Sequence, residues 1–171
     1  MGAGAAQVIL WKRSKCSRFF HVSLSFAGEQ REYVRRVSKA LQRTHKLKVF
    51  FDEEQQSRLA ATHVNSTLDE IFRFHSKWVV VFCSKEYVQK KWPSFEGRSI
   101  VAAALEEPDN YLILATFDDA HLPGWPDTYH RFDLSKMKAS AFAKAIADVI
   151  AQRTLVDRNL IFFKMATRQY R

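Results

Sequence analysis

Glu96 is the residue of this sequence with the clearest potential for chemistry, because it follows Trp92 by four residues in the stretch "SKEYVQKKWPSFE" (84–96). Positions four apart lie on one side of a helix, so the two side chains would be neighbours if a helix continues through Pro93. A carboxylate in such a place can act on a ligand, whereas a Glu on a solvated helix is one more surface charge, which is the usual case. The stretch is compatible with both interpretations, so the elements that hold it decide between them.

Five segments predict β-strands. The run "WVVVFC" (78–83) directly precedes the Glu96 stretch and is apolar throughout, as expected for a strand covered on both faces. Aromatic and β-branched residues predict four more strands, at 18–26, 47–51, 111–117 and 130–134. Apolar residues at helical spacing predict helices between and after them, and Ser84 can cap the helix that begins there.

This alternation of strands and helices indicates an α/β fold, with a mostly parallel sheet and helices on both faces. In such a sheet, ligands bind beyond the carboxyl ends of the strands. The candidate site therefore comprises the four stretches that follow the first four strands: "SFAGEQ", "DEEQQSRLAA", "SKEY…WPSFE" and "DDAHLPGW".

The composition fits one domain of 171 residues with a net charge of +9. A basic chain favours anionic partners, but charges spread over helix faces are typical of a solvated surface. The two cysteines are far apart and the six histidines never pair with them at ligand spacing, so we expect neither a disulfide framework nor a metal site. The N-terminus does not read as a signal peptide and no apolar run approaches ~20 residues, which favours a cytoplasmic protein without a membrane partner.

Several enzyme classes lack their motifs here. The sequence contains no glycine-rich phosphate loop and no G-x-S-x-G nucleophile elbow. A phospho-acceptor receiver domain shares the strand pattern, but it needs an Asp at the end of the third strand, where this chain reads "FCSK".

Three of the candidate loops together resemble a Toll/interleukin-receptor (TIR) domain. "HVSLSFAGEQREYVRRVSKAL", "LKVFFDEE" and "WVVVFCSKEYVQKKWPSFE" are similar, in order and spacing, to the family's first box, its second strand and its third strand with Trp-x-x-x-Glu. The resemblance implies a flavodoxin-like TIR fold over residues 17–152, with a five-stranded sheet. It leaves residues 1–16 as an extension and 153–171 as a basic tail, which either packs on a protein surface or begins a linker to another domain. One departure is the family's BB loop, which here keeps Leu59 but lacks the Trp-Gly found in many members.

The resemblance also implies an activity, since some TIR domains cleave NAD+ to nicotinamide and ADP-ribose or a cyclic ADP-ribose. NAD+ is then the substrate, and no cofactor is expected. Glu96 matches the catalytic Glu, and the substrate-binding residues would be Ser25, Phe26, Leu59, Ser84 and Trp92. The alternatives are that Phe26 belongs to the core, that Trp92 only packs, and that Ser84 is only a helix cap.

Two other functions remain open at this stage. A non-enzymatic TIR adaptor would act through TIR–TIR contacts, although many adaptors lack the Glu that this chain has. A nucleic-acid binder has only the positive charge in its favour, and no recognised motif. By family analogy we expect self-association into homo-oligomers or filaments, a possible sensor domain or partner protein, and a role in immunity, cell death or anti-phage defence.

Overall fold

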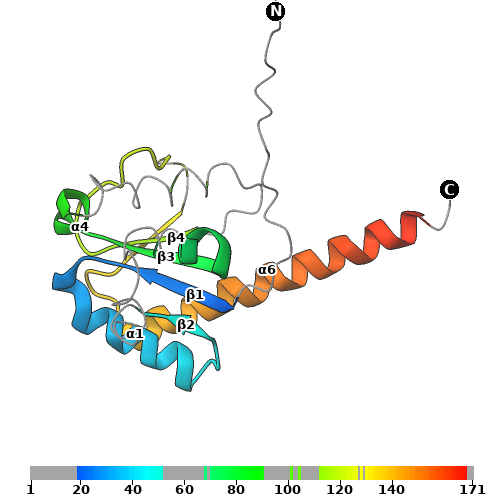
Figure 1. The fold of residues 1–171 in the computed structure, drawn as a ribbon, viewed down its shortest axis with the longest axis horizontal. Helices are drawn as coiled ribbons and strands as arrows, with labels where there is room; N and C mark the ends of the chain where they lie inside the picture. The colour runs from blue at the N-terminus through cyan, green and yellow to red at the C-terminus, as the bar shows by residue number, and fades with distance from the viewer. Residues whose placement is uncertain are drawn as a thin grey trace, which may run out of the picture.

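A five-stranded parallel sheet forms the centre of the molecule (Figure 1). The computed structural model describes residues 19–51, 68, 70–90, 101, 104, 112–126, 128 and 130–168, with side chains as far as residue 156. The strands are β1 (Phe20–Ser25), β2 (Val49–Phe50), β3 (Ser76–Cys83), β4 (Leu112–Thr116) and β5 (Arg131–Asp133). They lie in the order β2-β1-β3-β4-β5, so all five strands predicted from the sequence are confirmed, most of them slightly shorter than predicted.

The helical elements follow the strands in alternation. They are the 3₁₀ turn η1 (Gly28–Gln30), α1 (Arg31–Arg43), the π-helical turn η2 (Ile71–His75), α4 (Lys85–Lys90) and α6 (Ala139–Arg168). The prediction that Ser84 caps a helix is confirmed, because its Oγ accepts the N–H of Tyr87 at 3.2 Å. Pro93 lies outside the described residues, so the question whether a helix continues through it stays untested.

Both faces of the sheet are buried. Along β3, Trp78, Val80 and Phe82 belong to one core cluster, while Val79, Val81 and Cys83 belong to the other. Alternate residues of a strand point to opposite faces, so a strand covered on both sides must be apolar throughout. This explains why "WVVVFC" shows no polar alternation.

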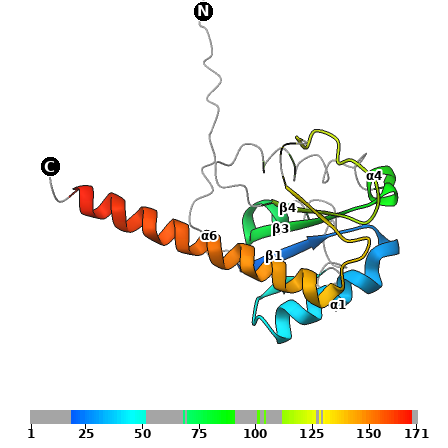
Figure 2. The ribbon, with the colours of Figure 1, turned by 180° about the vertical axis from the view of Figure 1, so that it is seen from behind.

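Helices α1 and α6 cover the same face of the sheet (Figures 1 and 2). Helix α1 buries a stripe of residues at helical spacing, Val34, Val37 and Leu41, and the first half of α6 adds Phe142 and Ile146. The first turn of α1 is joined to the residues just before α6, because the Tyr33 hydroxyl donates to the carbonyl of Met137 at 3.0 Å.

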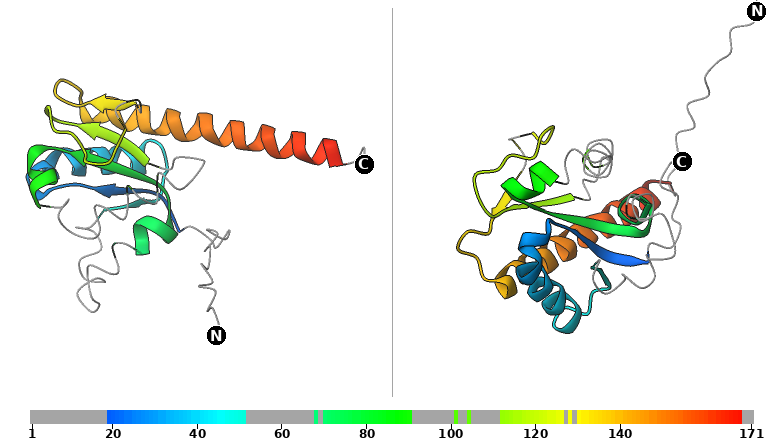
Figure 3. Two further views of the ribbon diagram at one scale, coloured as in Figure 1. Left: turned by 90° about the horizontal axis from the view of Figure 1, so that it is seen from above. Right: turned by 60° about the vertical axis from the view of Figure 1, so that its left-hand side comes forward.

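Helix α6 continues well past the sheet, as the left view of Figure 3 shows. The domain boundary expected at residue 152 falls inside this one helix, which ends at Arg168. Beyond Ile150 the described side chains include exposed apolar ones, since Leu155 and Val156 are 60% and 54% exposed. Among the described helices, none is long and apolar enough to cross a membrane.

Candidate functional site

The carboxyl ends of β1 and β3 lie side by side at the centre of the sheet. Ser25, the last residue of β1, is in register with Val81 of β3. The chain leaves β1 toward the face covered by α1 and leaves β3 toward the opposite face, where Tyr87 of α4 packs. Such a switch point is where an open parallel sheet of this strand order forms its ligand crevice.

Two serine hydroxyls contact Tyr87 at this switch point. Ser25 Oγ is hydrogen-bonded to the Tyr87 hydroxyl at 2.9 Å, and Ser84 Oγ accepts the Tyr87 N–H at 3.2 Å. Ser25 is 9% exposed, and Ser84 and Tyr87 are each 1% exposed. The structure therefore brings together two of the residues predicted from the sequence, Ser25 and Ser84, through a third that was not among the predicted site residues.

Tyr87 could have been found from its position in the sequence. It lies three residues after the helix cap Ser84, on the inner side of the helix, where a phenol is long enough to reach a neighbouring strand. A buried Tyr usually has a hydrogen-bond partner for its hydroxyl, which makes an inward-facing Tyr beside a candidate site informative.

Phe26 lies on the other side of the sheet from this cluster. Its ring stacks on Phe51 at 5.4 Å between centroids, and the guanidinium of Arg31 lies 5.3 Å from its centre. Only 6% of Phe26 is exposed, and it belongs to the core cluster under α1 and α6. These contacts agree with the alternative in which Phe26 is a core residue, and its stacking on a substrate ring stays a prediction.

Charged side chains join α4 to the loops on both sides of it. Glu29 pairs with Lys90, and Gln30 Nε2 donates to Glu86 Oε2 at 3.2 Å, which joins the loop after β1 to α4. On the β4 side, Lys85 Nζ lies 2.8 Å from Asp119 Oδ1. Helix α4 is thus held between the loops that follow β1 and β4.

Asp118 adds a backbone contact to the β4 side. Its carboxylate accepts the backbone N–H of Lys85 at 3.2 Å and that of Ala120 at 2.9 Å. One carboxylate thereby ties the first turn of α4 to the loop after β4.

These contacts also change the acidity of the carboxyls. The hydrogen bond from Lys90 holds the pKa of Glu29 below its usual range, and the hydrogen bond from Lys85 does the same for Asp119. The pKa of Lys85 is raised in turn by Asp119. The pKa of Glu86 is lowered first by a hydrogen bond from its own backbone N–H and second by one from the Ser84 side chain. All four groups are therefore charged at neutral pH, as ordinary surface carboxylates and amines are.

Three of the predicted site residues lie outside the residues that the structure describes: Leu59, Trp92 and Glu96. Glu96 follows the end of α4 at Lys90 by six residues in the sequence. At the switch point the described residues supply Ser25, Tyr87 and Ser84, which are buried and joined by hydrogen bonds. The carboxylate predicted from the sequence, Glu96, belongs to the segment after α4. Within the described part of the chain, no group of three or more His, Cys, Asp or Glu is placed to hold a metal ion.

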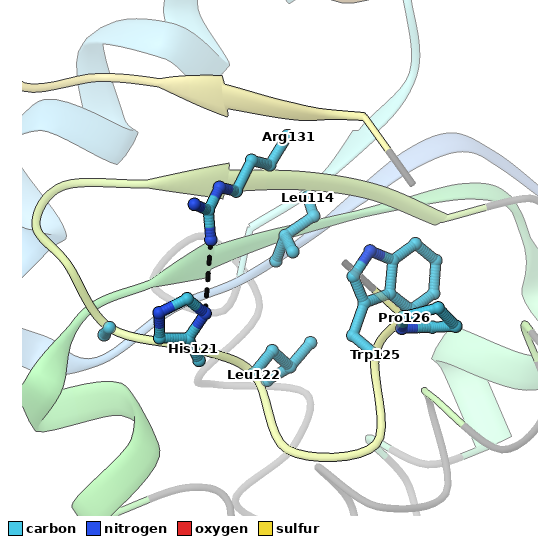
Figure 4. Close-up of a pocket in the computed structure, with 7 residues that line it drawn as sticks. Leu114, His121, Leu122, Trp125, Pro126 and Arg131 are labelled. Atoms are coloured by element: carbon cyan, nitrogen blue, oxygen red, sulfur yellow. Dashed lines mark hydrogen bonds between the residues drawn. The ribbon is translucent and has the colours of Figure 1, made fainter. Parts of the chain in front are cut away.

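A small pocket lies elsewhere, between β4, the loop after it and β5 (Figure 4). His121 Nδ1 and a guanidinium nitrogen of Arg131 lie 3.3 Å apart at its rim, and Leu122 and Trp125 form part of its lining. None of the predicted site residues that the structure describes lines it. This pocket is therefore distinct from the contacts among Ser25, Tyr87 and Ser84 at the switch point.

The comparisons with known proteins agree on one family. Residues 22–150 match the family model described as a TIR domain. A 3' cyclic ADP-D-ribose synthase, AaTIR, of Aquimarina amphilecti is 38% identical over 105 residues, which are 61% of this chain and 32% of that protein. The chain thus matches about a third of the length of that relative.

A solved structure shows the same fold. It is the crystal structure of the TIR domain of the Toll-related receptor TRR-2 from Hydra magnipapillata, with a TM-score of 0.53 and 13% identity. The likeness covers 81% of this chain and 97% of that one. At that identity the likeness concerns the fold alone.

Proposed function

Because this chain belongs to the TIR domain family, and a synthase of a cyclic ADP-ribose is 38% identical to it, we propose that it is an NAD+ nucleosidase. It cleaves the nicotinamide–ribose bond and releases nicotinamide with ADP-ribose or a cyclic ADP-ribose. The observation that carries the proposal is this identity, together with the Trp-x-x-x-Glu pattern at Trp92 and Glu96 after a confirmed third strand. NAD+ is the substrate.

Cleavage of this bond requires little from the protein beyond one carboxylate. The bond between the nicotinamide nitrogen and C1′ of ribose breaks, and its electron pair leaves with nicotinamide, whose ring charge is neutralised. The positive charge that develops on the ribose is stabilised by a nearby carboxylate, the role proposed for Glu96. Addition of water then gives ADP-ribose, whereas attack by a hydroxyl of the same molecule gives the cyclic product, and either step releases one proton.

We expect Glu96→Gln and Glu96→Ala to lower kcat for NAD+ cleavage by about 100- to 1,000-fold, the usual effect of removing one charge-stabilising group. We also propose that self-association activates the enzyme, so the measurement is nicotinamide release by concentrated or clustered protein. Mass spectrometry of the other product distinguishes ADP-ribose from a cyclic form.

Glu32→Gln is the matched control, since Glu32 is an exposed carboxylate of α1 that pairs with Arg35 and Arg36 at the surface. It is expected to retain wild-type turnover. Equal turnover by the wild type and both Glu96 variants would overturn the assignment of Glu96. Oligomers that form with rising concentration but never consume NAD+ would instead favour a non-enzymatic adaptor.

We also propose that the protein acts in the cytoplasm as an effector or signal generator in immunity or cell death. The support is the family alone, and the proposal predicts that cells expressing the clustered wild type lose NAD+ while those expressing Glu96→Gln do not.

A further inference from the structure

The hydrogen bond between Ser25 and Tyr87 is the buried link between β1 and α4. It joins residues 62 positions apart in the sequence, at 2.9 Å, with both side chains at most 9% exposed. The Tyr87 ring is part of the core on the α4 side, together with Val81 and Cys83. The phenol therefore fixes α4 both by packing and by a directed bond.

Tyr87 is also held through its backbone. Its N–H donates to Ser84 Oγ, and Ser84 is itself 1% exposed. Ser84 and Tyr87 thus close the first turn of α4, and Ser25 ties that turn to the end of β1. A helix of only six residues is not stable by itself, so its orientation depends on contacts of this kind.

The charged contacts at the outside of α4 are weaker candidates for this role. Lys85 and Lys90 are 61% and 59% exposed in their pairs with Asp119 and Glu29. Exposed ion pairs are screened by salt and many contribute nothing measurable, whereas a buried hydroxyl left without its partner carries a full desolvation penalty. The loss of the buried bond should therefore matter more than the loss of either ion pair.

We propose that Tyr87 is a positioning residue: through its hydrogen bond to Ser25 across the switch point, it fixes α4 and thereby the start of the segment that carries Glu96. The proposal rests on the proposed NAD+ cleavage for the reaction it serves. It assigns Ser25 a different task from the one expected from the sequence, because Ser25 then supports Tyr87 and does not bind substrate.

Tyr87→Phe tests the bond with the least change of shape, since the ring stays and only the hydroxyl is removed. We expect kcat for NAD+ cleavage to fall by about 10- to 100-fold, as for a small misplacement of a catalytic group, with KM little changed. Amide hydrogen exchange in α4, residues 85–90, should become faster. Tyr33→Phe is the matched control, because it removes a tyrosine hydrogen bond to Met137 on the other face of the sheet.

Ser25→Ala distinguishes the two roles of Ser25. If Ser25 only supports Tyr87, Ser25→Ala should show the same loss in kcat as Tyr87→Phe, with KM little changed. The double variant, with both substitutions, should then have a kcat no lower than that of either single variant. A rise in KM for Ser25→Ala with full kcat for Tyr87→Phe would overturn the proposal and assign Ser25 to substrate binding.

The exchange measurement keeps this proposal separate from the proposed function. If clustered wild-type protein does not consume NAD+, the proposed function fails, and the exchange rates of α4 still show whether Tyr87 fixes that helix. Exchange in Tyr87→Phe equal to that in the wild type and in Tyr33→Phe would overturn the positioning role.

Discussion

At the scale of single residues, neighbours in the sequence have different environments here. Ser25 and Phe26 are adjacent, yet Ser25 bonds to Tyr87 on the α4 side of the sheet and Phe26 stacks on Phe51 on the other. Successive residues of an extended chain point to opposite faces, so one stretch at a strand end serves both the site and the core.

Cys83 illustrates how burial determines reactivity at this edge. It is the last residue of β3, it is 0% exposed, and burial together with the charge of Asp118 raises the pKa of its thiol to about 12. The thiolate is the reactive form of cysteine, so almost none is present at neutral pH. We expect iodoacetamide to leave Cys83 unmodified in the native protein and to alkylate it in urea, as measured by peptide mass spectrometry. Equal labelling rates in the two conditions would contradict this.

At the scale of elements, short pieces are held by contacts from their neighbours. Strand β2 has two residues, and its attachment to β1 includes a side chain: His21 Nδ1 accepts the backbone N–H of Lys48 at 2.8 Å. The backbone N–H of His21 donates in turn to the Lys48 carbonyl at 2.8 Å. Helix α4 is held in the same manner, by Ser25 on one side and Asp118 on the other.

The β1–β2 contact predicts a pH dependence of stability. Burial, followed by the charges of Lys48 and Lys77, lowers the pKa of His21 below its ordinary 6.5. A lowered pKa means that the folded state favours the neutral ring, so its contribution to stability is complete above pH 6.5 and is lost as the pH falls through the folded pKa. His21→Gln keeps an acceptor but does not titrate.

The measurement is urea unfolding of the wild type and His21→Gln on both sides of pH 6.5. We expect the unfolding free energy of the wild type to decrease more steeply on the acid side than that of the variant. Parallel pH profiles for the two proteins would show that the His21 contact contributes nothing.

At the scale of the whole molecule, the order of the strands decides where a site can form. The order β2-β1-β3-β4-β5 puts the switch point between β1 and β3. Helices α1 and α6 cover the face of the sheet opposite to the face on which α4 packs. Helix α6 belongs to the domain in its first half and extends past the sheet in its second (Figure 3). The two halves should therefore differ in what they contribute to stability.

Two truncations on α6 test this difference. Ile146 is 0% exposed in the core, so Ile146→Ala should lower the unfolding free energy by about 2–5 kcal/mol through lost burial and the cavity it leaves. Leu155 is 60% exposed, so Leu155→Ala should change it by no more than about 0.5 kcal/mol. Denaturant unfolding of both variants is the measurement, and similar losses for the two would show that residues past the sheet are packed in solution.

The sequence by itself determined the strands, their parallel arrangement, the burial of the 78–83 strand on both faces, the cap at Ser84 and the family. An apolar run and a serine before a helix are each visible within a few residues, whereas the alternation of elements and the three family motifs are read from their order along the chain. Only the tertiary structure decided that Ser25 reaches Tyr87 and that Phe26 stacks on Phe51. Both contacts join segments far apart in the chain, and which side chains meet depends on strand order and register, which no local pattern encodes.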